Sequence, residues 1–194
     1  QPCLDENGRM FKNVGVLWNI EERKGKLENG LRDFRSEKDA ITGLLNGKGL
    51  EAKMAQYFMC HCISQKNALI VVEAANFQFM QKKAGTLWSD RFLMEVAGIV
   101  KHAFRSTDEV AHLGQGLFAV FMKAIDDVAV VPAKAKRLQL ALESGSQDMV
   151  GIDWRLGMSI YPLEGRTYTE LLRAVEEKLK EVVEKRVKID NSEE

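Results

Sequence analysis

The chain has 194 residues, of which 45% are hydrophobic, and this is enough to bury the core of one main domain. Lysine plus arginine and aspartate plus glutamate number 28 each, so the formal net charge is zero and no basic field is available to bind a nucleic-acid polymer. No apolar run approaches the roughly 18 residues that cross a bilayer, and the N-terminus lacks the blocks of a signal peptide. We therefore expect no membrane contact by this chain and a cytoplasmic location, alone or as the cytoplasmic part of a larger, membrane-attached protein.

The first 38 residues have a pattern of their own. Residues 9–20 alternate apolar and polar side chains in places and predict one strand, which we assign to a truncated neighbouring domain at 1–20 because a lone strand has nothing to pair with. Residues 21–38 are charged and helical in composition. Apolar residues recur at a spacing of seven, at Ile20, Leu27, Phe34 and Ile41. The segment 21–38 is therefore either a solvated linker helix with one packed stripe or a helix that dimerises as a coiled coil.

The elements of the main domain follow residue 38. The sequence "DAITGLLN" leads into a helix over about 47–60, and the continuous apolar run "ALIVVEAANF" at 68–77 is typical of a strand buried on both faces. A helix is predicted from about Ser89, whose hydroxyl would cap it, to Phe104. Further along, the pattern predicts a hairpin around "GQG", a helix over 128–143, a strand within 151–162 and a last helix over 169–186. Helices and strands that alternate around one apolar sheet predict an α/β or α+β sandwich.

The three cysteines indicate neither a disulfide framework nor a metal site. Their number is odd, and only Cys60 and Cys62 are close together, in "CHC". One turn of chain cannot supply four ligands, and the sequence has no second cluster of cysteine and histidine. We therefore predict no metal site in this segment.

The motifs of the main domain, in this order, resemble the GGDEF family, the diguanylate cyclase domains of bacterial second-messenger signalling. "DAITGLLN" at 39–46 is similar to the family's opening motif, and "LIVVEAANF" resembles its strand ending in D-x-D-x-F. "GQGLF" at 114–118 stands at the place of the GG[DE]EF signature, and "RLGMSIYP" resembles a later strand. The resemblance implies a central, mostly antiparallel sheet flanked by helices, preceded by the linker helix.

The N-terminal segment carries a second resemblance. "GRMFKNVGVLWNIEERKGKLE" is similar to the end of a PAS sensor domain, where a final strand runs into a signalling helix. The implied order is a PAS-like strand at 1–20, a signalling helix at 21–38, a degenerate GGDEF domain at 39–187 and a polar tail at 188–194. The other domains of the parent protein are then expected partners, and so is a second copy of the chain through the signalling helix.

The resemblance also implies which residues would carry catalysis, and several of them are replaced. Joining two GTP molecules into cyclic di-GMP requires metal ions held between carboxylates, one from the "VVE" strand and one from the signature. Glu73 takes the first position, whereas Gly116 and Leu117 stand in place of the signature acids. Gln115 replaces a glycine of the phosphate turn and adds a side chain where a positive φ is expected. We therefore predict no catalytic residue, no cofactor, Mg²⁺ binding that is lost or weak, and no enzymatic activity.

A vestigial substrate pocket is expected where the family holds GTP. By resemblance, Gln81 and Asp90 stand where an asparagine and an aspartate hold the guanine base. Asp90 is equally explained as an acid near the start of a helix, where the helix dipole favours negative charge. The complete set of vestigial positions is Asn46, Glu73, Gln81, Asp90, Gly114, Gln115 and Gly116.

The sequence "RSTD" lies five residues before the signature and resembles R-x-x-D, the inhibitory site at which the family binds its product, cyclic di-GMP. Arginine can donate two hydrogen bonds to guanine O6 and N7, and aspartate can accept from the N–H groups of the base. The alternative for Arg105 and Asp108 is a surface ion pair at the end of a helix. The following helix is expected to add a second basic residue, either Lys136 or Arg137.

The sequence thus predicts a catalytically inactive GGDEF-like domain that binds cyclic di-GMP through this site and passes its occupancy on through the preceding helix. One alternative is a nucleotide-free interaction or dimerisation module, favoured if side chains fill the space beside Ala74, Ala75 and Leu117. Another is a regulatory domain that binds GTP through Asp90 and Asn46. Residual cyclase activity is the last alternative, and it requires the chemistry that Gly116 cannot supply.

Overall fold

The computed structural model describes the backbone of residues 37–60, 65–145 and 150–190, and the side chains of these ranges up to Glu181. The strand predicted within 1–20, residues 21–36 of the helix predicted at 21–38 and the last four residues of the tail lie outside the described residues. The predicted end of that helix at Lys38 is wrong, because Lys38 forms an isolated β-bridge with Leu45. Among the helices that are described, none combines the length and the apolar character needed to cross a membrane.

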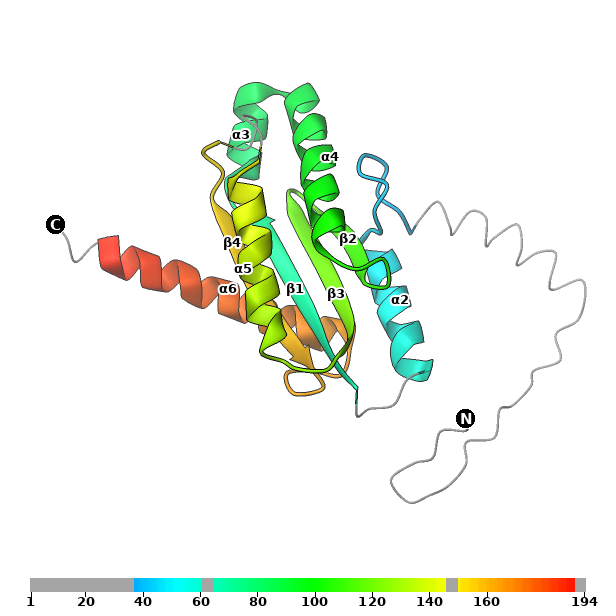
Figure 1. Cartoon of the computed structure of the whole chain (residues 1–194). Helices are drawn as coiled ribbons and strands as arrows, with labels where there is room; N and C mark the ends of the chain where they lie inside the picture. Colours follow the sequence, from blue (N-terminus) through cyan, green and yellow to red (C-terminus); the bar gives the residue numbers. More distant parts are fainter. Residues whose placement is uncertain (1–36, 61–64, 146–149, 191–194) are drawn as a thin grey trace, which may run out of the picture. The chain divides into compact units, whose positions relative to one another are not determined.

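An antiparallel sheet of four strands runs through the domain (Figure 1). The strands are β1 (Lys66–Ala74), β2 (Glu109–Gly114), β3 (Leu117–Ile125) and β4 (Trp154–Tyr161). Their spatial order is β2-β3-β1-β4, and each neighbouring pair is antiparallel. β2 and β3 form the hairpin around "GQG", and β1 pairs with β3 in the middle of the sheet. The predicted mixed fold with an antiparallel sheet is confirmed.

Helices cover both faces of the sheet. They are α2 (Gly47–Cys60), α3 (Phe77–Ala84), α4 (Thr86–Ala103), α5 (Val130–Glu143) and α6 (Tyr168–Asp190). α4, α5 and the start of α3 contribute buried side chains to one apolar cluster, and α2 and α6 contribute to a second. The domain therefore has three layers, with the sheet between two layers of helices.

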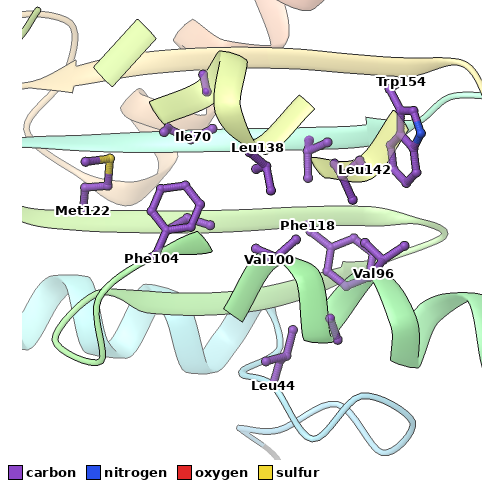
Figure 2. Packing of buried hydrophobic residues seen from close by; sticks show 14 of the residues in the cluster. Leu44, Ile70, Val96, Val100, Phe104, Phe118, Met122, Leu138, Leu142 and Trp154 are labelled. Atoms are coloured by element: carbon purple, nitrogen blue, oxygen red, sulfur yellow. The ribbon is translucent and has the colours of Figure 1, made fainter. Parts of the chain in front are cut away.

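Burial on both faces explains the apolar run in β1. Ala68, Ile70 and Val72 belong to the cluster of α4 and α5, whereas Leu69 and Val71 belong to the cluster of α2 and α6. Successive side chains of a strand point to opposite faces, so a strand between two helical layers has no position that favours a polar residue. Figure 2 shows how side chains from β1, β3, α4 and α5 meet in the first cluster. This two-sided core fixes the end of β1 relative to the hairpin.

The start of α4 differs from the predicted one. The helix begins at Thr86, and the hydroxyl of Ser89 donates a hydrogen bond to the carbonyl oxygen of Thr86 at 2.8 Å, inside the first turn. Gly85, with a φ of 88°, forms the turn between α3 and α4, so the helix starts earlier than the serine suggests. The predicted Ser89 cap is therefore wrong. At the other end of the chain, α6 continues to Asp190, so the tail predicted at 188–194 begins inside a helix.

The apolar run that contains β1 continues into a helix that the pattern does not predict. β1 ends at Ala74, and Phe77 begins α3. Between them, the amide of Asn76 donates to the carbonyl oxygen of Gly151 at 2.7 Å and accepts from the N–H of Asp153 at 3.0 Å. These contacts join segments far apart in sequence, so the change from strand to helix is set by tertiary structure rather than by the local pattern.

Candidate functional site

The end of β1 lies against the turn of the hairpin. Glu73 is paired with Leu117 across β1 and β3, and the backbone N–H of Ala74 donates to the carbonyl oxygen of Gly116 at 3.0 Å. The structure therefore brings together the retained acid of the "VVE" strand and the segment that stands at the family signature.

The turn itself has no room for a side chain at position 116. Gly114, Gln115 and Gly116 all have positive φ, at 100°, 51° and 78°. A Cβ atom on Gly116 would lie 2.8 Å from both Cβ and Cγ of Phe77. Because carbon atoms that are not bonded pack at about 3.5–4.0 Å, any side chain at position 116 would have to displace Phe77.

A hollow of about 550 Å³ lies beside this turn. Its lining residues are Glu73, Ala74, Ala75, Gln78, Leu113, Gly114, Gln115 and Leu117. The space next to the two alanines is thus open rather than filled by side chains. Across the hollow, the amide of Gln78 donates a hydrogen bond to the side-chain oxygen of Gln115 and ties the turn to α3.

The residues of this hollow supply only one of the two carboxylates that the family resemblance implies for the metal ions. Glu73 is the only carboxylate among its lining residues, and the position of the second acid is Gly116. Over the described ranges, no three histidine, cysteine, aspartate or glutamate side chains are grouped closely enough to hold a metal. Cys60 is an exposed thiol, and Cys62 lies outside the described residues.

The other vestigial positions do not line this hollow. The amide of Gln81 donates to the hydroxyl of Ser89 at 3.1 Å, and Asp90 is half-buried near the start of α4. Asn46 accepts the N–H of Gly49 at 2.9 Å and so caps the start of α2. These three residues therefore lie outside the hollow beside the turn, and Asn46 has a local structural role.

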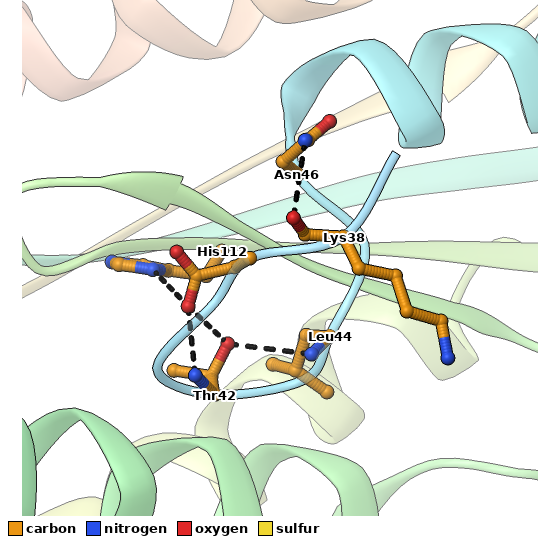
Figure 3. A network of polar contacts seen from close by, with 6 residues as sticks. Lys38, Thr42, Leu44, Asn46 and His112 are labelled. Atoms are coloured by element: carbon orange, nitrogen blue, oxygen red, sulfur yellow. Dashed lines mark hydrogen bonds and ion pairs between the residues drawn. The ribbon is translucent and has the colours of Figure 1, made fainter. Parts of the chain in front are cut away.

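The opening motif is held against the hairpin by a polar network (Figure 3). The Oδ1 atom of Asp39 accepts hydrogen bonds from the N–H and the hydroxyl of Thr42, at 2.8 and 2.7 Å, and lies 3.2 Å from Nδ1 of His112. The backbone N–H of His112 donates to the carbonyl oxygen of Leu45 at 2.8 Å. The opening motif at 39–46 is thus joined to β2 by both backbone and side-chain contacts.

Sequence reasoning did not identify His112 as a partner of Asp39. The imidazole is 5% exposed and stacks on Phe118, with 4.7 Å between the ring centroids. Neither ring nitrogen has a well-aligned hydrogen bond within the described residues, so the contact with Asp39 is one of proximity and charge rather than of ideal geometry. The pair could have been suspected from the sequence, because the opening motif contains an acid, Asp39, and the hairpin contains an imidazole, His112, and the fold brings these two motifs together.

This network predicts an acid-dependent contribution to stability. Burial alone would raise the pKa of the Asp39 carboxyl, but the hydrogen bonds from Thr42 and the neighbouring His112 outweigh burial and hold the pKa below its ordinary value of 3.8. A lowered pKa in the folded state means that the stabilisation is present above that ordinary value and is lost as the pH falls through the folded pKa. We expect Asp39→Asn to lower the free energy of unfolding by about 1–2 kcal/mol at pH 7.

Urea unfolding at pH 7 and at several values below pH 4 measures this contribution, because the difference between Asp39→Asn and the unaltered chain should shrink toward low pH. Asp126→Asn is the matched control: the carboxylate is exposed, and its replacement should change stability by less than about 0.5 kcal/mol. A difference for Asp39→Asn that is the same at all pH values would show that the carboxylate is not stabilised in the folded state.

The aspartate of "RSTD" has a structural role. The carboxylate of Asp108 accepts the backbone N–H of Arg105 at 3.1 Å and that of Lys123 at 3.2 Å. It thereby ties the end of α4 to the end of β3. Within the described residues, the Arg105 guanidinium makes no ion pair with Asp108 or with any other side chain. The surface ion pair considered from the sequence is therefore not formed.

Two hollows adjoin this turn, and both Arg105 and Asp108 line each of them. The larger, of about 710 Å³, is bordered by Lys38, Gly43, Leu44, Leu45, Lys101, His102, Phe104, Arg105, Ser106, Asp108, Glu109 and Val110. The smaller, of about 150 Å³, is bordered by Arg105, Asp108, Met122, Lys123, Ala124, Ile125, Asp126, Asp127, Val130 and Lys134. The lysine that α5 contributes here is Lys134, whereas Lys136 and Arg137 are exposed on the same helix and line neither hollow.

Several solved structures share this fold. A sensory box/GGDEF family protein from Caulobacter crescentus has a TM-score of 0.68 at 28% sequence identity, with 77% of this chain and 99% of that chain covered. The isolated GGDEF domain of PA1120 (TpbB or YfiN) from Pseudomonas aeruginosa has a TM-score of 0.66 at 21% identity, covering 74% and 86%. The GGDEF domain of DgcB from C. crescentus, solved in complex with c-di-GMP, has a TM-score of 0.61 at 17% identity, covering 74% and 88%.

The sequence comparison with curated proteins gave no significant match. Residues 36–188, however, match the family model described as "Diguanylate cyclase, GGDEF domain". This span contains all four strands of the sheet and the opening motif. The chain therefore belongs to the GGDEF family.

Proposed function

We propose that this chain is a catalytically inactive GGDEF domain that acts as a receptor for cyclic di-GMP. The observation that carries the proposal is the Arg105 side chain, which is exposed, has no partner within the described residues and borders two hollows. Such an arginine can donate two hydrogen bonds to the edge of a guanine base without breaking an existing contact. The choice of ligand is supported by the GGDEF domain of DgcB, which shares the fold and was solved in complex with c-di-GMP.

The absence of cyclase activity is supported by the turn and its hollow. Glu73 has no second carboxylate beside it among the lining residues, and position 116 cannot hold one without displacing Phe77. The hydrogen bond between Gln78 and Gln115 occupies the turn that would cradle phosphate by the family resemblance. Losing a metal ligand and the phosphate turn together removes two sources of transition-state stabilisation, each worth several kcal/mol.

The segment that precedes the domain is proposed to transmit the signal. We assign residues 1–20 to the end of a PAS-like sensor and residues 21–38 to a signalling helix that passes ligand occupancy to the neighbouring domains. This assignment rests on the sequence motifs alone, since the two segments lie almost wholly outside the described residues.

A second candidate is an interaction module that binds no nucleotide. The role of Asp108 favours it, because a carboxylate that ties α4 to β3 has a reason to be present without any ligand. The diguanylate cyclase SiaD from P. aeruginosa, which shares the fold, was solved in complex with its activator SiaC, so protein partners occur within this fold. A GTP-binding role is less well supported, because Asn46 already caps α2.

Calorimetric titration of cyclic di-GMP into the purified 194-residue chain tests the proposal. We expect a dissociation constant in the micromolar range or below for the unaltered chain. Arg105→Ala should weaken binding by about 10-fold to 100-fold, because a bidentate contact to guanine is worth about 1–3 kcal/mol. Arg137→Ala is the matched control, since this arginine is exposed nearby on α5 but borders neither hollow.

Two outcomes would contradict the proposal. If the unaltered chain gives no heat with cyclic di-GMP and equilibrium dialysis also shows no binding, the interaction module becomes the better account. If Arg105→Ala and Arg137→Ala bind equally well, the ligand site lies elsewhere on the domain. Titration with GTP and Mg²⁺ in the same series tests the GTP-binding alternative directly.

A further inference from the structure

The larger hollow has a cationic rim of which the proposed guanine contact uses only Arg105. Lys38 comes from the segment before α2, Lys101 from the last turn of α4, and Arg105 from the loop that follows α4. All three side chains are exposed. Within the described residues, none of the three makes an ion pair or a side-chain hydrogen bond. Figure 3 shows the Lys38 side chain extending away from the network of Thr42 and His112.

The acidic groups on the same rim are engaged elsewhere. The carboxylate of Asp108 accepts two backbone N–H groups, and Oε1 of Glu109 lies 2.6 Å from Nζ of Lys123. His102 donates its Nδ1–H to the carbonyl oxygen of Gly98, 2.7 Å away, because a carbonyl can only accept. With Glu109 paired to Lys123, the two lysines and Arg105 outnumber Asp108 on the rim, so the hollow has a net positive charge.

The wall of the hollow is apolar. Leu44 and Phe104 are each 8% exposed, and Leu45 and Val110 are half-buried beside them. A cavity with an apolar wall and a cationic rim suits a ligand that combines flat ring surface with negative charge. A phosphate group meets the second requirement, because ammonium and guanidinium groups form strong charge-assisted hydrogen bonds with its oxygens.

We propose that the larger hollow holds a phosphodiester of the cyclic dinucleotide whose guanine Arg105 binds, and that Lys38 and Lys101 are its cationic ligands. This inference rests on the proposed function and adds to it the side of the turn on which the ligand lies. A phosphate that contacts both Lys38 and Lys101 links the 37–45 segment to the end of α4. Lys38 ends the segment 21–38 that the sequence predicts as a signalling helix, although the structure places Lys38 itself in a β-bridge with Leu45. The ligand therefore contacts the chain at the point where this segment joins the domain.

Titration of cyclic di-GMP into Lys38→Gln, Lys101→Gln and the double variant tests this assignment. Both lysines are exposed, so the variants should fold normally. Each single change should weaken binding about threefold and the double change about tenfold, as expected for exposed charge contacts. Lys101→Arg, which keeps the charge, should bind like the unaltered chain. The salt dependence of the affinity should also fall in the double variant, because fewer charges meet the phosphate.

Lys134→Gln reports on the smaller hollow and distinguishes the two sides of the turn. If Lys134→Gln and Arg105→Ala weaken binding while the Lys38 and Lys101 variants do not, the ligand lies in the smaller hollow, and this inference fails although the receptor function stands. Absence of binding by the unaltered chain overturns both.

Amide hydrogen exchange gives a second test of whether the ligand stabilises the 37–45 segment. Addition of cyclic di-GMP should slow amide exchange within 37–45 in the unaltered chain and have little effect there in the double variant. Binding that leaves exchange in this segment unchanged would show that the ligand does not hold Lys38.

Discussion

Replacing Gly116 by aspartate, which restores the signature acid, is expected to lower the free energy of unfolding by about 2–5 kcal/mol and to yield no cyclase activity. The Cβ atom of the new residue would lie 2.8 Å from Phe77, and overpacking of a core contributes about 1–3 kcal/mol. The φ of 78° adds about 1–2 kcal/mol for a residue with a side chain. Urea unfolding measures the stability, and a product assay with GTP and Mg²⁺ or Mn²⁺ measures the activity.

Two alanine variants separate the contributions to this effect. Gly114 also has a positive φ, but a Cβ atom there would meet nothing within 4 Å, so Gly114→Ala reports the backbone conformation alone. Gly116→Ala adds the contact with Phe77 and should destabilise by about 1–3 kcal/mol more. Equal effects of the two variants would show that Phe77 moves aside without cost. Turnover of GTP by the unaltered chain would overturn the proposed inactivity, whereas turnover by Gly116→Asp alone would show that the missing acid is the main defect of the site.

The sequence could predict the sheet because its signals are local. β1 is one continuous apolar run, and the hairpin is two apolar segments around a short glycine-containing turn, so period and turn chemistry were enough. α3 could not be predicted in this way, because Asn76 ends the strand through contacts with Gly151 and Asp153. The Ser89 prediction failed for a related reason: Gly85 starts the helix earlier, and a serine in the first turn bonds inside the helix.

The candidate site was predicted in parts. The motif "RSTD" singled out Arg105, which the structure places exposed beside two hollows, and its role in binding the ligand stays a prediction. A spacing argument could not tell which residue of α5 reaches the smaller hollow. Successive residues of a helix point in different directions around its axis, at about 3.6 residues per turn. Because the length of the loop before α5 was uncertain, the prediction fell on Lys136 and Arg137 instead of Lys134. The presence of Lys38 and Lys101 at the same hollow depends on how the opening segment folds onto β2, which no local pattern contains.

Replacing Phe118 by alanine is expected to lower the free energy of unfolding by about 3–5 kcal/mol. Phe118 is the last residue of the signature segment "GQGLF", and we expect this large effect even though the acids of the signature are replaced. Phe118 is fully buried in the cluster of α4 and α5, and its ring also stacks on His112. Packing alone is therefore a sufficient reason for a phenylalanine at this position. Urea unfolding at pH 7 measures the loss, and Phe121→Ala is the matched control, because Phe121 is equally buried in the cluster on the other face of the sheet.

The two phenylalanines should differ in how they couple to Asp39, because only Phe118 contacts His112. Milder variants that stay folded make this measurable: Phe118→Leu and Phe121→Leu, each costing about 1 kcal/mol, combined with Asp39→Asn. The effects should add for Phe121 and should deviate from additivity by about 0.5–1 kcal/mol for Phe118. Additivity in both pairs would mean that the Phe118 ring fills space without positioning His112. Coupling at Phe118 alone would mean that the buried signature residue helps to hold the opening segment, and with it Lys38, at the edge of the hollow where the ligand is proposed to bind.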